Sequence, residues 1–272
     1  RVYLQRYFSN VDKGNFFLID EAHNLVSRSR EMYSAEINTD QVVKAQELFE
    51  TSGHDVDSST VKRWLNRLGN ELTIIQNTFE KENKEALVDY QPLGPLENVM
   101  LKFNEAVREW LPKQPDGDLT DQILSVFFAC SVYLKIAEYY DESYRIIIKK
   151  TEVGINVQEQ ILDPSPYLDA SLKKGRGAVF FSATLSPVDY YQETLGSSDA
   201  LSLRMDSPFE QRQQNILITD YIDTRFANRE ESLPQIVASI DTLVSAKAGN
   251  YLIFCPSYAY LDQIASAFRV LR

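Results

Sequence analysis

The apolar positions of the chain recur with two different periods, and the change between them divides it into parts. Residues 16–19, Phe-Phe-Leu-Ile, form a short apolar run that ends in Asp20 and Glu21, and similar runs occupy residues 177–181 and 250–255. Short apolar runs bounded by polar residues are typical of strands that are buried on both faces of a parallel sheet. The three runs therefore predict strands of an α/β sheet, each with a polar cluster at its carboxyl end.

Between the first two runs, the apolar residues recur at helical spacing. One stripe spans residues 65–79, a second spans residues 96–110, and residues 120–141 predict a third helix that is rich in aromatic side chains. Such spacings place apolar side chains on one face of a helix, and stripes of matching length predict an antiparallel helical bundle. At residues 144–150 the pattern becomes β-rich, and we expect residues 154–162 to pair with that run.

These patterns predict four segments along the chain. The segments are residues 1–35, 36–160, 161–195 and 196–272. The second is a mostly helical insertion within the first sheet, and the last begins another sheet. Within the last segment we expect short strands at 201–204 and 216–219 and helices at 233–246 and from 259 onward.

The charge is unevenly distributed between these segments. The chain has a formal net charge of −11 and a pI near 4.8. Nucleic-acid binders usually carry a basic footprint, so the whole-chain charge argues against that class. However, residues 36–160 hold 13 Lys and Arg against 22 Asp and Glu, a net of −9, which leaves only −2 elsewhere. The acidity belongs mainly to the insertion, and most of the objection disappears for the sheet segments.

The cysteines and the hydropathy pattern bear on the compartment. Cys130 and Cys255 each lie in an apolar run, which predicts buried reduced thiols rather than a disulfide or a metal site. No apolar stretch approaches the roughly 20 residues that cross a bilayer, and residues 1–6 lack the layout of a signal peptide. We therefore expect a cytoplasmic protein, in the cytosol or nucleoid of a bacterium, with no membrane partner.

A distinctive polar cluster follows each of the three predicted strands. The clusters are Asp20-Glu21-Ala22-His23, Ser182-Ala183-Thr184-Leu185-Ser186-Pro187 and Cys255-Pro256-Ser257-Tyr258. The first, directly after an apolar strand, resembles the motif of DEAH-type superfamily-two helicases. The ordered set, with a helical insertion between its first two members, resembles the XPD/DinG family of superfamily-two DNA helicases. The resemblance implies parts of two RecA-like domains of the P-loop NTPase type, the second starting within residues 196–272, and an insertion like the family's Arch domain.

The resemblance also implies roles for the first two clusters. Asp20 would bind Mg²⁺ through water, and Glu21 would orient or deprotonate the water that attacks the γ-phosphate of ATP. His23 would link the nucleotide site to the second motor domain, although a histidine taken alone is more often structural. The hydroxyl cluster would hydrogen-bond to the Asp20–His23 loop and relay its state to DNA, with a simple strand-end turn as the alternative. That cluster consists of Ser182, Ala183 and Thr184.

Two further groups are candidates for contact with single-stranded or forked DNA. A hydroxyl or backbone N–H can reach a phosphate, and an aromatic ring can stack on a base. The turn that resembles the family's DNA contact consists of Pro256, Ser257 and Tyr258, and its alternative is a turn with a buried tyrosine. The basic residues that could touch the DNA backbone, or form only a solvated cluster, are Lys173, Lys174 and Arg176.

The chain departs from the family pattern in two places. It contains no Gly-x-x-x-x-Gly-Lys-Ser/Thr phosphate loop, and it lacks the later motif whose arginine completes the nucleotide site. We therefore expect the chain to be the middle of a longer ATP- and Mg²⁺-dependent helicase. As a fragment, it should not hydrolyse ATP on its own. The iron–sulfur cysteines of some members precede the first cluster, so the presence of such a cluster stays open.

Two other functions are compatible with the sequence. In the first alternative, the longer protein would be a DinG-like nuclease with a helicase-like region; in the second, it would be a non-catalytic module that binds nucleic acid or protein. In the second case the acidic insertion would be the face that meets a protein partner. For the helicase, the family's 5′-to-3′ polarity and a role in DNA repair or replication are expected.

Overall fold

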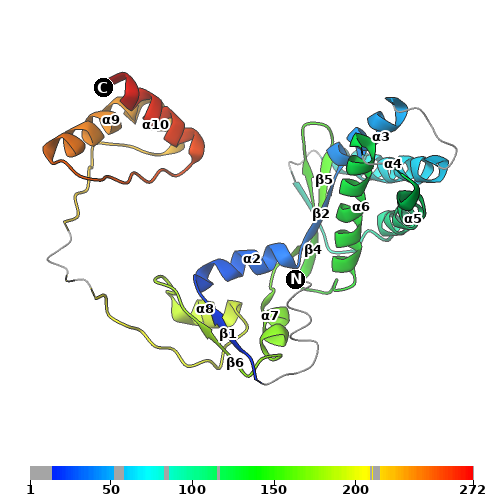
Figure 1. The fold of residues 1–272 in the computed structure, drawn as a ribbon, viewed down its shortest axis with the longest axis horizontal. Coiled ribbons are helices and arrows are strands. Elements are labelled where there is room, and N and C mark those ends of the chain that lie inside the picture. The colour runs from blue at the N-terminus through cyan, green and yellow to red at the C-terminus, as the bar shows by residue number, and fades with distance from the viewer. Residues whose placement is uncertain are drawn as a thin grey trace. The chain divides into compact units, whose positions relative to one another are not determined.

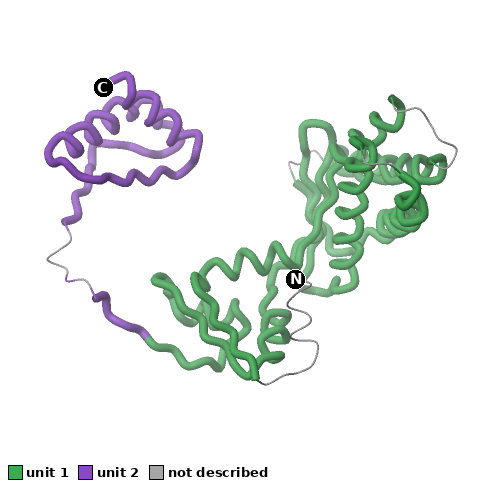
Figure 2. The backbone as a smooth tube through the Cα atoms, viewed as in Figure 1, with its two compact units in different colours: residues 1–203 green, residues 204–272 purple. Residues whose placement is uncertain are grey.

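The computed structural model describes residues 14–51, 58–82, 86–114, 117–208, 210 and 215–271. The chain divides into two compact units, residues 1–203 and residues 204–272 (Figure 2). The sequence also favours a helix or turn over residues 1–15 that leads into the first strand, and this segment lies almost wholly outside the described residues.

The first unit begins with a two-stranded parallel sheet (Figure 1). Strand β1 (Phe16–Ile19) pairs with β6 (Gly177–Phe180), although 157 residues lie between the end of β1 and the start of β6. The chain therefore leaves the sheet after β1 and returns to the neighbouring position. The predicted adjacency of these two runs is therefore confirmed. Helices α2 (Leu25–Met32), α7 (Ser165–Leu172) and α8 (Val188–Thr194) accompany the sheet.

The residues that the structure describes cover one face of this sheet and leave the other exposed. A small core of Val26, Leu168 and Leu195, one from each helical segment, packs with Phe180 of β6. On the other face Leu18 is 73% exposed, and Phe16 and Val179 are also exposed. The expectation of strands buried on both faces is therefore wrong for this chain, because a two-stranded sheet with helices on one side leaves alternate side chains in solvent.

The insertion contains its own antiparallel sheet. The strands are β2 (Ala35–Asn38), β3 (Ala86–Asp89), β4 (Tyr144–Lys150) and β5 (Ile155–Ile161), in the spatial order β2-β5-β4-β3. The predicted pairing of the last two is confirmed, with Ile147 opposite Gln158. The sequence pattern did not predict the two short outer strands.

Four long helices complete the described part of the insertion (Figure 1). They are α3 (Thr39–Thr51), α4 (Ser59–Lys81), α5 (Gly94–Trp110) and α6 (Asp118–Ala137), with a short 3-10 turn η3 (Leu111–Lys113) after α5. The predicted stripes point inward: Leu65, Leu68 and Leu72 of α4 and Met100 and Phe103 of α5 are fully buried. They form one core with the inner face of the sheet, which extends from Ala35 to Ile161.

The expectation that no stretch of the chain is long and apolar enough to cross a bilayer is wrong for helix α6. By length and composition its 20 residues could span a membrane. In the structure it is a core helix, because Ile123, Val126, Cys130 and Tyr133 on one side of it are buried in the insertion. Its high apolar content extends to the opposite side as well.

The second unit consists of helices in the part that the structure describes. Helix α9 (Arg229–Ala246) follows the 3-10 turn η5 (Phe226–Asn228), begins earlier than predicted and contains Pro234, and α10 (Tyr258–Leu271) begins one residue before the predicted position. The strands expected at 201–204, 216–219 and 250–255 are wrong, since none of these residues is in a strand and Phe254 is 86% exposed. A strand is stabilised by its neighbours, and the described residues of this unit offer no strand to pair with.

Candidate functional site

The carboxyl end of β1 makes an abrupt turn that presents two carboxylates. Glu21 has φ 48° and ψ 42°, a left-handed conformation that is uncommon outside glycine. The conformation is held on both sides, because the Glu21 N–H donates to Asp20 Oδ1 at 2.7 Å and the Ala22 N–H donates to the Phe181 carbonyl at 3.2 Å. Strained backbone of this kind is often found at functional sites, where the surroundings fix it.

The 3-10 turn η1 (Ala22–Asn24) that follows aims His23 at the end of the neighbouring strand. His23 Nδ1 lies 2.7 Å from Ser182 Oγ and 3.3 Å from Glu21 Oε2. Ser182 Oγ also donates to Glu21 Oε2 at 3.3 Å, and Thr184 Oγ1 lies 3.5 Å from His23 Nδ1. The structure therefore brings together residues that lie about 160 positions apart in the sequence, at the carboxyl edge where α/β sheets bind their ligands. Ala183 lies between the two hydroxyl residues and is exposed.

Asp20 is suited to hold a cation through water. Its carboxylate is exposed, and Oδ1 accepts one backbone hydrogen bond, while Oδ2 accepts none from the residues that the structure describes. Within those residues no group of three or more His, Cys, Asp or Glu side chains converges on one point. A single exposed carboxylate is compatible with Mg²⁺, which keeps several waters and is usually held by one or two carboxylates together with substrate phosphates, and Mg²⁺ at Asp20 stays a prediction.

The basic residues lie at the opposite end of β6 from Ser182. Lys173 Nζ pairs with Asp169 Oδ2 at 2.5 Å, which raises the pKa of the lysine. The guanidinium of Arg176 lies over the ring of Phe16, 5.7 Å from its centroid. Lys174 follows Lys173 in the same turn. These residues precede the strand, so the structure does not bring them to the carboxylates.

The turn with the third cluster belongs to the second unit. Ser257 caps helix α10, since its Oγ accepts from the Tyr260 N–H at 3.3 Å and its carbonyl accepts from the Leu261 N–H at 3.0 Å. Tyr258 is 88% exposed, so the alternative of a buried tyrosine is wrong. Pro256 precedes the cap, and Cys255 is partly exposed rather than buried as predicted.

A tyrosine cluster at the root of the insertion was missed by the sequence analysis. The ring of Tyr33, which follows α2, stacks on Tyr167 of α7 with centroids 5.0 Å apart. Tyr139 packs edge-on against Tyr167 at 5.6 Å, and the Tyr167 hydroxyl donates to the Tyr139 carbonyl at 3.1 Å. Burial and the neighbouring Asp141 carboxylate raise the pKa of Tyr167 to about 12. The sequence could have indicated this cluster, because Tyr33 and Tyr167 lie just outside the two predicted ends of the insertion, which must come close together.

This cluster connects the insertion to the site through two short helices. Helix α2 begins directly after the His23 turn and ends at Met32, immediately before Tyr33, while α7 carries Tyr167 and leads into β6 and Ser182. The segments that contain α2 and α7 are thus joined at both ends, by the contact between His23 and Ser182 and by the stacked rings of Tyr33 and Tyr167.

Comparison with known proteins gives a likeness in structure alone. No family model and no curated protein matches the chain. A solved structure of Xpd4 from S. tokodaii is similar to it, with 14% identity, a TM-score of 0.51 and coverage of 97% of this chain and 53% of that chain. The chain thus spans about half the length of that protein. The likeness establishes an XPD-like mixed α/β fold, which confirms the resemblance drawn from the sequence at the level of fold.

Proposed function

We propose that the chain is part of an ATP-dependent DNA helicase of the XPD/DinG type, which couples ATP hydrolysis to 5′-to-3′ movement on single-stranded DNA and to duplex unwinding in repair or replication. The observation that carries the proposal is the contact between His23 and Ser182 at 2.7 Å. It joins the Asp-Glu-Ala-His turn to the hydroxyl cluster of the adjacent parallel strand, which is the arrangement expected if one loop senses the nucleotide and the other transmits its state. In this proposal the two-stranded sheet belongs to the first RecA-like domain and residues 196–272 to the second.

The proposed roles of the residues at the carboxylate site follow from their exposure and contacts. Asp20 would hold Mg²⁺ through water, and the bound ion would supply positive charge against the charge that develops on the phosphates. Glu21 is exposed and adjacent, so its carboxylate orients the attacking water and accepts its proton. His23 and Ser182 hold Glu21 from the side, because both contact Oε2 at 3.3 Å. Positioning and charge stabilisation provide most of the catalysis in phosphoryl transfer.

For DNA contact, Tyr258 is the strongest candidate in the chain. Its ring is almost wholly exposed at the start of α10, where it can stack on a base while the Ser257 hydroxyl reaches a phosphate. Lys174 remains a candidate for a backbone contact. Lys173 and Arg176 are less suited, since one is paired with Asp169 and the other covers Phe16.

The proposal is tested on the longer protein. Glu21→Gln keeps the size of the side chain but removes its charge, so we expect DNA-stimulated ATP hydrolysis to fall by about 100-fold or more, with unwinding of a forked duplex lost. Glu193→Gln, on the exposed side of α8, is the matched control and leaves both activities unchanged. Wild-type ATPase and unwinding in Glu21→Gln would contradict the mechanism. A second variant, Ser182→Ala, should impair unwinding more than hydrolysis if the hydroxyl transmits the state of the loop.

A further inference from the structure

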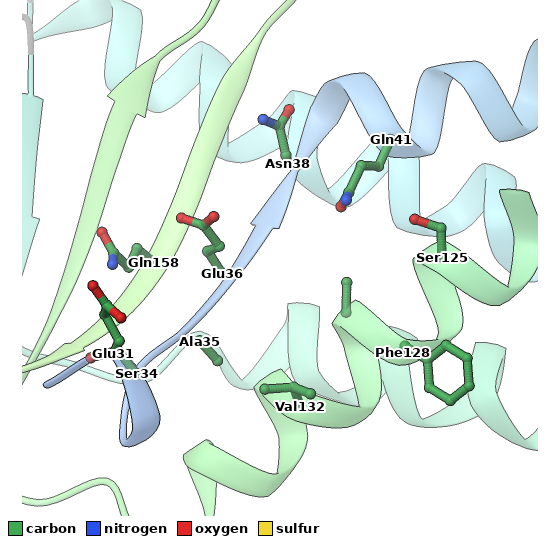
Figure 3. Close-up of a pocket in the computed structure, with 11 residues that line it drawn as sticks. Glu31, Ser34, Ala35, Glu36, Asn38, Gln41, Ser125, Phe128, Val132 and Gln158 are labelled. Carbon is green, nitrogen blue, oxygen red and sulfur yellow. The ribbon is translucent and has the colours of Figure 1, made fainter. Parts of the chain in front are cut away.

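A groove of about 570 Å³ lies in the insertion, apart from the carboxylate site (Figure 3). It runs along strand β2 and is bounded by the sheet on one side and by helix α6 on the other. Its two walls differ in chemistry, and each wall shows what kind of side chain would fit against it.

The wall formed by α6 is apolar and exposed. Phe128 and Val132, one helical turn apart, are 58% and 53% exposed, and Ala129 of α6 and Ala35 of β2 lie beside them in the groove. Surface helices normally carry polar residues on the side away from the core. Helix α6 instead stays apolar on both sides, although only one side packs in the insertion core. Exposed apolar patches with a polar rim mark interaction sites.

The wall formed by the sheet is acidic. Glu31 at the end of α2 and Glu36 of β2 contribute carboxylates, and Gln158 of β5 contributes an amide. Glu36 is only partly satisfied, since Asn156 Nδ2 donates to Oε2 at 2.9 Å. The eleven residues that line the groove include two carboxylates and no Lys or Arg. The insertion as a whole carries a net charge of −9. A basic partner therefore complements this wall, whereas the phosphates of a nucleic acid would be repelled.

Strand β2 forms the floor between the two walls and is an edge of the sheet. Among the strands that the structure describes, it pairs with β5 alone. Its outer side therefore presents backbone N–H and C=O groups to which an extended peptide can add as a further strand. Successive side chains of such a strand point to opposite sides, so one set would meet Phe128 and Val132 and the other would meet Glu31 and Glu36.

We propose that this groove binds an extended segment of another protein in which apolar and basic residues alternate, added along the outer edge of β2. The apolar side chains cover Phe128 and Val132, and the Lys or Arg side chains pair with Glu31 and Glu36. The site is independent of ATP hydrolysis, so it can be tested whether or not the chain belongs to a motor protein.

The test uses the 272-residue chain and three fluorescein-labelled peptides. One alternates Leu and Lys over nine residues, one has the same composition with Leu and Lys in separate blocks, and one alternates Leu and Glu. By fluorescence anisotropy we expect saturable binding of the alternating Leu-Lys peptide, at least tenfold weaker binding of the block peptide and no binding of the Leu-Glu peptide. Amide hydrogen exchange should slow in Ala35–Asn38 on binding.

Variants of the two walls separate the proposal from non-specific attraction. Phe128→Ser with Val132→Ser should weaken binding at least tenfold at all salt concentrations, and Glu31→Gln with Glu36→Gln should weaken it and reduce its dependence on salt. All four side chains border the groove rather than the core, so the thermal midpoint should stay unchanged. The controls are Val88→Ser, on the exposed strand β3 at the other edge of the sheet, and Glu105→Gln with Glu109→Gln on α5; neither should alter binding.

Several results would overturn the proposal. They are equal binding of the alternating and block peptides, unchanged binding in the wall variants, a loss in the controls as large as in the variants, and protection of β3 instead of β2. Concentration-dependent dimerisation that Phe128→Ser abolishes would assign the groove to a second copy of the chain. Competition by single-stranded oligonucleotide for the same residues would assign it to nucleic acid.

Discussion

Glu159 stands out among the individual residues, because it is a fully buried carboxylate in a row of apolar side chains. It lies on β5 between Val157 and Ile161 and faces the helices, with Ile146 and Ala35 opposite it on the neighbouring strands. Burial first, and then the nearby Glu97 carboxylate, raise its pKa from 4.5 to about 8, although the adjacent Tyr133 hydroxyl acts in the opposite direction. The neutral form is therefore the one that the fold accommodates.

This shift predicts how the stability of the insertion depends on pH. The folded state keeps the Glu159 proton up to about pH 8, while the unfolded chain releases it near the ordinary value of 4.5. Its contribution is thus fully present below pH 4.5 and is lost as pH rises through 8. Since one pKa unit corresponds to about 1.4 kcal/mol, we expect the free energy of unfolding to fall by about 2–4 kcal/mol from pH 5 to pH 9.

Urea unfolding, followed by tryptophan fluorescence, measures this dependence. Both tryptophans, Trp64 and Trp110, lie in the insertion, so the signal reports on that part of the chain. Glu159→Gln places a neutral isostere in the core and should flatten the profile, whereas Glu109→Gln on the exposed face of α5 should keep the wild-type slope. An unchanged slope in Glu159→Gln would show that another group is responsible.

At the scale of elements, the long helices depend on the buried stripes that the sequence displays. Leu68 of α4 is fully buried, so Leu68→Ala should lower the free energy of unfolding by about 3–5 kcal/mol through lost burial and the cavity that remains. Ile74 lies on the exposed side of the same helix, and Ile74→Ala should change it by less than about 0.5 kcal/mol. Equal effects of the two changes in urea unfolding would mean that α4 does not pack as described.

The elements that the sequence predicted correctly are those whose burial repeats over many residues. Helices α4 and α5 show their stripes over several turns, and β4 and β5 are seven residues each. Strands β2 and β3 are only four residues long and include polar positions, so their period is too short to recognise. They become strands because β5 and β4, which lie far along the chain, offer backbone partners. The run at 250–255 is the converse case, with strand-forming residues and no described neighbour.

The candidate site was predictable for a related reason. Parallel neighbouring strands end at the same edge, so the sequence indicated that Ser182 would lie near the Asp20–His23 turn, and the structure places it there. The left-handed backbone of Glu21 could not be predicted from the sequence, since it depends on hydrogen bonds to Asp20 and Phe181. The function of these contacts stays a prediction.

At the scale of the whole molecule, the hydrophobic cores are separate. The buried residues of the large core run from Ala35 to Ile161, with partly buried Tyr33 and Tyr167 packed against it from outside that range, while the sheet of β1 and β6 has a core of three buried residues. The two ends of the insertion are tied together, because Ser34 Oγ accepts from the Ile161 N–H at 3.1 Å. At the second end, the Leu162 N–H also donates to the Ser143 carbonyl, inside the insertion, at 2.9 Å. The stability of the insertion should therefore depend little on the rest of the chain.

Excision of the insertion tests this separation. We expect residues 33–164, expressed alone, to unfold cooperatively in urea with a free energy within about 2 kcal/mol of that of the insertion in the whole chain, the difference reflecting mainly the lost contacts of Tyr167 with Tyr33 and Tyr139. Leu68→Ala should destabilise the excised segment as much as it does the whole chain, because sites that share no partners add. An excised segment without a cooperative transition would show instead that the tyrosine cluster is required for the fold, and the insertion would then be part of the same folding unit as the carboxylate site.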